Sequence, residues 1–121
     1  MLTRTTLQKF SLTNPPSFAL QRENEVQKKY DIVMKDKERM ANFLEDVKRE
    51  LETEKFYLVE NDFPYFTEKG IKHLVCWYKD YEPCMIEREL RTKFGVITCW
   101  KNKPANCSIS EVSHIHVFIH E

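Results

Sequence analysis

Glycine is scarce in this chain, which has only Gly70 and Gly95 among its 121 residues. Loops that cradle phosphates and fingerprints that bind dinucleotides need several glycines close together, because the backbone must approach the phosphate groups. The sequence therefore excludes the commonest kinds of ATP and NAD site.

An excess of one charge is also missing, since 19 basic residues balance 19 acidic residues. Proteins that bind nucleic acids normally carry a basic surplus that displaces counterions from the phosphates. The longest apolar stretch lies within "HLVCWY", far short of the roughly 20 residues of a membrane-spanning helix. We expect no nucleic-acid partner, no transmembrane segment, and a length that fits a single domain.

Cysteine pairs of the C-x-x-C type are absent, so neither a zinc ribbon nor a thioredoxin-like motif is indicated. Of the four cysteines, Cys76 and Cys99 lie in apolar runs and each precedes a tryptophan. This context predicts buried thiols that behave as small hydrophobic side chains. The spacing leaves open a disulfide between a pair of the four.

The first 22 residues contain basic and hydroxyl side chains but no acidic residue. That composition is typical of a mitochondrial transit peptide, and a plain N-terminal arm is the alternative. Pro15 and Pro16 prevent the segment from forming one helix. We therefore expect residues 1–21 to form an extended arm that includes an uncleaved targeting-like segment, and residues 22–121 to form one α+β domain.

Residues 26–51 carry apolar side chains at alternating steps of four and three, with Lys37 as the one interruption. This spacing predicts one long amphipathic helix, or two shorter ones bent near Asp36. The other faces are densely charged, which is typical of a solvated surface. A two-chain coiled coil is the alternative. The apolar positions are Val26, Tyr30, Val33, Met40, Leu44, Val47 and Leu51.

Four segments read as strands: residues 55–61, 71–79, 96–100 and 113–121. The second is apolar on both faces, which predicts a central strand. Between the second and third strands, Pro83 at a first-turn position predicts a short helix that ends in a left-handed cap at Gly95.

The order helix, two strands, helix, two strands predicts the fold class. Short connections between neighbouring strands favour antiparallel pairing, with the helices packed on one face. We predict a two-layer α+β domain, in which an antiparallel sheet of about four strands carries one long N-terminal helix and one short helix, in the order α-β-β-α-β-β. Before the last strand, Ser108 and Glu111 have the spacing of a capping box, which predicts a brief helical turn.

The last strand, "SHIHVFIHE", carries three of the four histidines. Side chains alternate along a strand, so His114, His116 and His120 share one face while the aliphatic residues between them share the other. We expect the aliphatic face to meet the helices and the imidazoles to lie on the more open side. If this strand pairs with residues 71–79, His73 approaches His114 or His116.

Several roles are open to these histidines. A zinc site needs three or four converging N or S donors; His114 and His116 could supply two of them, and His73 or Cys99 could complete the set. A histidine-triad hydrolase is disfavoured, because the third position of His-x-His-x-His holds Phe118. A general acid–base pair with a carboxylate lacks a positioned nucleophile. The remaining possibility is a structural role, in which the imidazoles hydrogen-bond to the backbone or to one another. We therefore expect no cofactor and keep zinc as the alternative.

Three blocks of the sequence resemble a known family. "LQRENEVQKKYDIVM", "ENDFPYFTEKGIKHLVCWYK" and "SISEVSHIHVFIHE" are similar, in order, to a mainly fungal domain of unknown function whose named members are the N-acetylglucosamine-induced proteins. The similarity covers about residues 20–121. It places His73, Trp77, His114 and His116 on motif positions, but not His120. It implies a shared fold and no established activity, so sugar binding would be analogy alone.

The absence of a recognisable catalytic set predicts a non-enzymatic interaction module or an accessory subunit of a larger assembly, in mitochondria or otherwise in the cytoplasm. We expect its protein partner to bind through the N-terminal arm. Large rings dominate interface energies, and the candidates for partner contact are Phe10, Phe18, Trp77, Tyr78 and Trp100. The alternative is a small metal- or ligand-binding enzyme that uses His73, His114 and His116.

Overall fold

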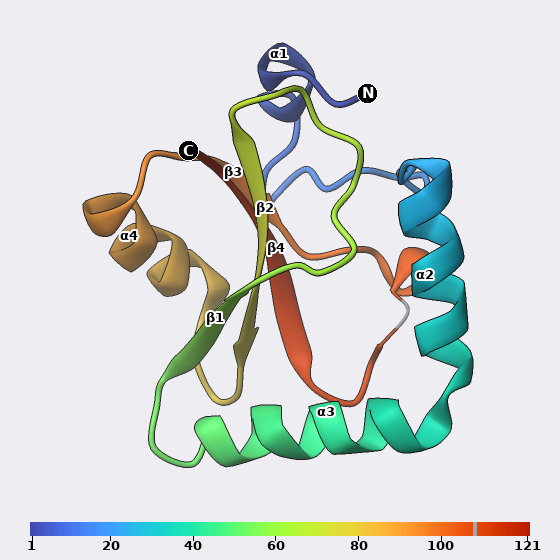
Figure 1. The fold of residues 1–121 in the computed structure, drawn as a ribbon. Helices are drawn as coiled ribbons and strands as arrows, with labels where there is room; N and C mark the ends of the chain where they lie inside the picture. Colours follow the sequence, from blue (N-terminus) through green and yellow to red (C-terminus); the bar gives the residue numbers. More distant parts are fainter. Residues whose placement is uncertain (108) are drawn as a thin grey trace.

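The computed structural model describes residues 1–107 and 109–121, and it centres on one antiparallel sheet (Figure 1). The strands are β1 (Phe56–Glu60), β2 (Ile71–Tyr78), β3 (Val96–Trp100) and β4 (Ser113–His120). They lie in the order β1-β2-β4-β3. The predicted sheet of about four antiparallel strands is confirmed.

Strand β4 lies in the middle of the sheet, between β2 and β3. Its register with β2 places Val75 opposite His116 and Trp77 opposite His114. The condition under which His73 was predicted to approach these histidines is therefore met.

The predicted single long helix is wrong, because the amphipathic stripe is divided between α2 (Asn24–Lys35) and α3 (Lys37–Glu50). At the break, Asp36 has an extended backbone with φ −85° and ψ 92°. Its carboxylate accepts a hydrogen bond from the backbone N–H of Arg39 at 3.0 Å, which caps the start of α3. The alternative of two helices bent near Asp36 is the one that holds, and Figure 1 shows the two helices running in different directions.

Helices cover both faces of the sheet, so the prediction of two layers with helices on one face is also wrong (Figure 1). Helix α4 (Pro83–Lys93) packs on the face that carries the aliphatic residues of β4. Helix α3 and the N-terminal arm pack on the other face, which carries the imidazoles. The expected inward aliphatic face is present, but the histidine face is covered as well. A strand that is apolar on both sides, as β2 is, requires both coverings.

The N-terminal arm folds back onto the sheet. It contains a short helix, α1 (Arg4–Leu7), where an extended arm was predicted. The Leu7 side chain is fully buried with Trp100 and Phe118. The hydroxyl of Thr98 donates to the carbonyl oxygen of Phe10 at 2.6 Å. The arm therefore forms part of this domain's own core.

Helix α4 begins at Pro83, as expected, but the predicted left-handed cap at Gly95 is wrong. The chain leaves the helix through Phe94 in an extended conformation. The glycine with a positive φ is Gly70, at 91°, in the turn before β2. The turn predicted from Ser108 includes a residue outside the described part of the chain.

All four cysteines are free. Cys76 and Cys99 are fully buried, and burial raises the pKa of each thiol to about 12. The prediction that these two thiols are buried among apolar side chains is confirmed. Among the described residues, no helix has the length and apolar character that crossing a membrane requires.

Candidate ligand-binding site

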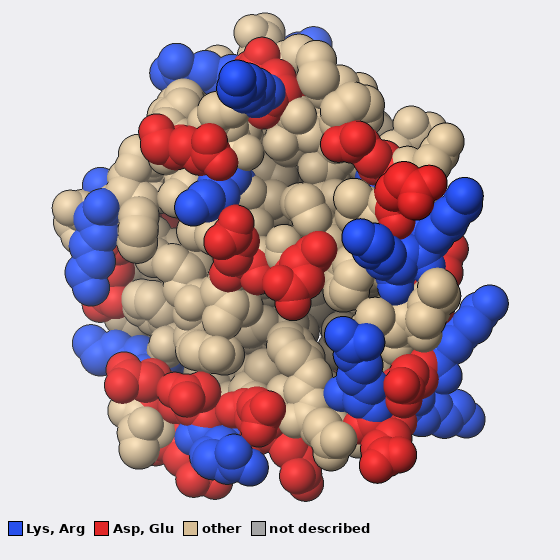
Figure 2. All heavy atoms as spheres, in the orientation of Figure 1, with Lys and Arg blue, Asp and Glu red and all other residues tan. Residues whose placement is uncertain are grey.

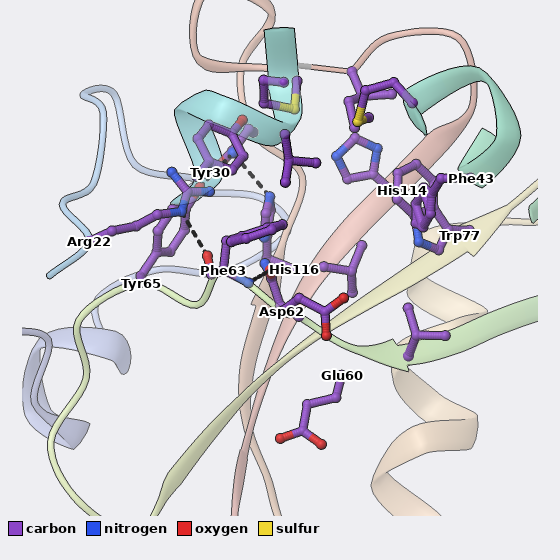
Figure 3. A pocket seen from close by; sticks show the side chains of 18 of the residues that line it. Arg22, Tyr30, Phe43, Glu60, Asp62, Phe63, Tyr65, Trp77, His114 and His116 are labelled. Carbon is purple, nitrogen blue, oxygen red and sulfur yellow. Dashed lines mark hydrogen bonds between the residues drawn. The ribbon is translucent and has the colours of Figure 1, made fainter. Parts of the chain in front are cut away.

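A cavity of about 630 Å³ lies between α2, α3 and the histidine face of the sheet (Figure 3). This volume is within the range of small-molecule sites, which are mostly apolar and contain a few placed polar groups. Figure 2 shows acidic side chains at the centre of this face of the molecule, with a recess beside them that Lys and Arg side chains border on the α2 side.

The helices supply the apolar wall, because their predicted amphipathic stripe turns toward the cavity. Val33 and Met34 of α2 and Met40 and Phe43 of α3 line it. The Phe43 ring meets the ring of Trp77 edge-on, with 5.5 Å between the ring centroids.

His116 lines the floor of the cavity, and His73, which does not line it, lies against His116. His73 and His116 are 3% and 6% exposed, and His73 Nε2 lies 2.8 Å from His116 Nδ1. The Nδ1 atom of His73 accepts the backbone N–H of Tyr65 at 3.1 Å. The Tyr65 ring stacks on both imidazoles, with centroid distances of 4.7 and 5.4 Å. The predicted approach of His73 to a histidine of the last strand is confirmed for His116.

Both imidazoles are neutral at pH 7. Burial, and secondarily the neighbouring His116 and Arg22, hold the pKa of His73 well below its usual value. Burial, with smaller effects from His114 and Arg22, lowers the pKa of His116 to about 3. Burial also lowers the pKa of His114, against the opposing effect of its hydrogen bond with the Val112 carbonyl. Groups that exchange protons efficiently in catalysis have pKa values near the working pH, so this floor favours binding over proton transfer.

Asn102 connects the histidine pair to two aromatic residues. Its Oδ1 atom accepts the indole N–H of Trp100 at 2.9 Å. Its Nδ2 atom donates to the hydroxyl of Tyr65 at 3.0 Å and lies 3.0 Å from His116 Nε2. Since an indole N–H can only donate, the bond to Trp100 fixes which end of the amide faces His116.

Arg22 places a positive charge in the wall of the cavity. Its guanidinium lies over the ring of Tyr30, 3.9 Å from the centroid, and 4.9 Å from the centroid of the Tyr65 ring. Its Nε atom donates to the carbonyl oxygen of Phe63 at 2.7 Å. Within the part of the chain that the structure describes, no carboxylate forms an ion pair with Arg22.

The indole N–H of Trp77 has no acceptor. Trp77 is 4% exposed and lines the cavity. Its Nε1 atom is the one buried side-chain nitrogen or oxygen, among the described residues, that lacks a hydrogen-bond partner. Such atoms are rare in folded proteins and each needs an explanation.

The predicted metal set is not assembled. Among residues 1–107 and 109–121, no group of three or more His, Cys, Asp or Glu side chains is placed to hold a metal ion. His114 turns its Nδ1 atom to the carbonyl oxygen of Val112 at 3.2 Å. Cys99 belongs to the core on the α4 side of the sheet, so it lies on the face opposite to His116.

Most of the aromatic rings predicted to contact a partner are packed inside the domain. Trp77, Tyr78 and Trp100 are 4%, 6% and 0% exposed. Phe10 packs edge-on against Trp100, with 5.5 Å between centroids. Phe18 differs, because it is 58% exposed.

Sequence reasoning missed Arg22, Tyr65 and Asn102 as members of the site. Tyr65 lies in "NDFPY", one of the segments that carried the family resemblance. Helix or strand periodicity could not reveal Arg22 and Asn102, because they lie outside the helices and strands.

Comparisons with known proteins show the family and the fold. The family model described as "Protein of unknown function (DUF3605)" matches residues 5–91. A crystal structure of a protein named HTC1 matches at a TM-score of 0.57 and 22% sequence identity, covering 84% of this chain and 76% of that one. At this identity the likeness shows the fold alone. No curated protein matches the chain. A domain of unknown function is thus confirmed, but the match begins in the arm and ends before β3, whereas a similarity over about residues 20–121 was predicted. The motif positions of His114 and His116 and the name N-acetylglucosamine-induced protein stay predictions.

Proposed function

Because the chain belongs to the DUF3605 family of proteins of unknown function, we propose a function from the cavity itself: the domain binds a small organic ligand between its sheet and helices α2 and α3. One observation carries the proposal. Trp77 lines the cavity, and its indole N–H is buried without an acceptor among the described residues.

A buried donor without a partner costs about 1–3 kcal/mol. A ligand with an acceptor atom in the cavity would recover that energy. The apolar wall from α2 and α3 would meanwhile bury the ligand's hydrocarbon part, which contributes about 25 cal/mol per Å² of apolar area. The neutral imidazoles support binding and not a proton-transfer reaction.

The test uses four probes that share a phenyl ring and differ in the polar group: 2-phenylethanol, phenylacetamide, phenylacetate and 2-phenylethylamine. Each is titrated into ¹⁵N-labelled protein and followed by NMR. The chain has two tryptophans, so the indole N–H signal of Trp77 can be assigned. We expect at least one probe to shift that signal saturably, together with the backbone amides of Val75 and His116.

A pair of neighbouring substitutions on α2 locates the binding site. Val33 lines the cavity, whereas Ile32 is 69% exposed and does not line it. We expect Val33→Trp to weaken binding by roughly tenfold, through occupied volume, and Ile32→Trp to leave it unchanged. If no probe produces saturable shifts, or if both variants behave alike, the domain does not bind ligands in this cavity.

We propose, as a second candidate, that the domain is an accessory subunit that binds a protein partner, in mitochondria or otherwise in the cytoplasm. The 58% exposed ring of Phe18 on the arm supports it. Native mass spectrometry of the co-purified protein would show a stoichiometric complex that Phe18→Ser abolishes. Phe94→Ser is the matched control, because Phe94 is also an exposed phenylalanine, at 40%. A monomer in every sample would refute this candidate.

A further inference from the structure

The hydrogen bonds that link His73, His116 and Asn102 leave one N–H donor without an acceptor. A neutral imidazole has one N–H and one lone pair. The backbone N–H of Tyr65 takes the lone pair on Nδ1 of His73. The proton of His73 must then lie on Nε2, and this N–H donates to Nδ1 of His116. His116 therefore carries its own proton on Nε2.

Among the described residues, that proton has no acceptor. The group within hydrogen-bond distance of His116 Nε2 is Asn102 Nδ2, at 3.0 Å, which is also a donor. Turning the Asn102 amide would present its oxygen to His116, but the same turn would take that oxygen away from the indole N–H of Trp100. One donor is left without an acceptor in either arrangement.

Asn61 contributes a further N–H donor that lacks an acceptor at this site. Its Oδ1 atom accepts the backbone N–H of Phe63 at 2.8 Å. Its Nδ2 atom is therefore turned toward His73 Nε2, at 3.5 Å, which is already a donor. The floor of the cavity thus offers N–H groups from Asn61, Asn102 and His116, and each of these residues lines the cavity.

The two ends of the cavity differ in charge, because one contains the guanidinium of Arg22 and the other is lined by aromatic rings. In Figure 3 Arg22, Tyr30 and Tyr65 lie at one end, Phe43 and Trp77 lie at the other, and His116 lies between them. The cation of Arg22 is close enough to act on the titration of both buried histidines. The acidic residues Glu60 and Asp62 also line the cavity and would repel an anion placed beside them. An anionic group is therefore favoured beside Arg22, away from these carboxylates.

We infer that the ligand is an organic carboxylate, whose oxygens accept N–H groups of His116 and Asn102 beside the guanidinium of Arg22. Its apolar part lies against Phe43, and a further acceptor atom reaches the indole N–H of Trp77. This inference rests on the proposed function. An ionised carboxylate only accepts hydrogen bonds, at about four lone-pair sites. It therefore supplies acceptors for the unpaired N–H groups and adds no donor of its own. Hydrogen bonds to a charged acceptor are also roughly twice as strong as neutral ones.

The four phenyl probes test the inference on the unmodified chain by isothermal titration calorimetry. We expect phenylacetate to bind at least roughly tenfold more tightly than 2-phenylethanol and phenylacetamide, and 2-phenylethylamine to bind most weakly. Equal affinities, or tightest binding of the amine, would overturn the carboxylate and leave ligand binding in place. Failure of all four probes would remove both proposals.

Substitutions then test the named groups. Arg22→Gln should weaken phenylacetate roughly tenfold and leave 2-phenylethanol unchanged. Arg88→Gln is the matched control, since Arg88 is exposed and does not line the cavity, and it should change neither affinity by more than about twofold. Asn102→Asp places a carboxylate of the protein beside His116 and should abolish phenylacetate binding. If Arg22→Gln weakens both probes equally, Arg22 has a structural role and the inference is wrong.

Discussion

Acidification provides the sharpest test of the buried histidine pair. In the unfolded chain each imidazole takes up a proton below its usual pKa of 6.5. In the folded chain His73 and His116 stay neutral until the pH is far lower. The unfolded state therefore binds more protons than the folded state between about pH 6.5 and pH 3, and the free energy of unfolding falls as the pH falls through that window.

The magnitude follows from proton linkage. A histidine whose pKa is 6.5 when unfolded and about 3 when folded contributes about 2 kcal/mol less stability at pH 5 than at pH 7. His73 changes the stability in the same direction, because its pKa is also lowered well below the usual value. The loss from His116 alone is a sizeable share of the roughly 5–15 kcal/mol that stabilises a typical domain.

Urea denaturation at pH 7, 6 and 5, followed by circular dichroism, measures this loss. His116→Gln should remove about 2 kcal/mol of it, because that ring no longer titrates. His120→Gln is the control, since His120 is exposed at the end of β4, and it should keep the full dependence. Equal unfolding free energies at pH 7 and pH 5 in the unsubstituted chain would refute the neutral pair. So would a full pH dependence in His116→Gln.

Three further predictions follow from packing and backbone geometry. Leu7→Ala should lower the free energy of unfolding by about 2–5 kcal/mol, because this arm residue is fully buried; a loss below about 1 kcal/mol in urea denaturation would mean that the arm is detachable. Gly70→Ala should cost about 1–2 kcal/mol, because Gly70 has a φ of 91°, whereas Gly95→Ala should be nearly neutral; equal melting temperatures for the two variants would contradict this difference. Cys84, which is exposed, should react with a thiol reagent in the native state, whereas the buried Cys76 should react only after unfolding; native labelling of both at equal rates would contradict the burial.

The strands could be predicted because each one is marked by its own residues. Alternation and β-forming side chains placed all four within about two residues of their observed ends. The number of layers could also have been inferred from β2. Seven of its eight residues are buried, and a strand buried on both faces needs cover on both sides.

The break between α2 and α3 was harder to predict, because an apolar stripe with helical period continues across it. What ends α2 is Asp36, whose side chain caps the next helix. A capping residue within a periodic segment competes with continuation of the helix, and the period alone does not show which conformation wins.

The folded-back arm and the site polar groups could not be predicted from local pattern. The bond between Thr98 and Phe10 spans 88 residues. Arg22 and Asn102 meet the histidines only after β2, β4 and the loops are in place. His73 and His116 were found because strand pairing fixes which side chains share a face.

The position of β4 in the sheet also has a consequence during synthesis. Both of its neighbours, β2 and β3, precede it in the chain, so they leave the ribosome before the strand that joins them. Until β4 arrives, each exposes an unpaired edge next to apolar side chains, which is a template for pairing with another chain. Nascent chains interrupted before Ser113 should therefore depend on chaperones, whereas a chain that includes β4 closes its own sheet.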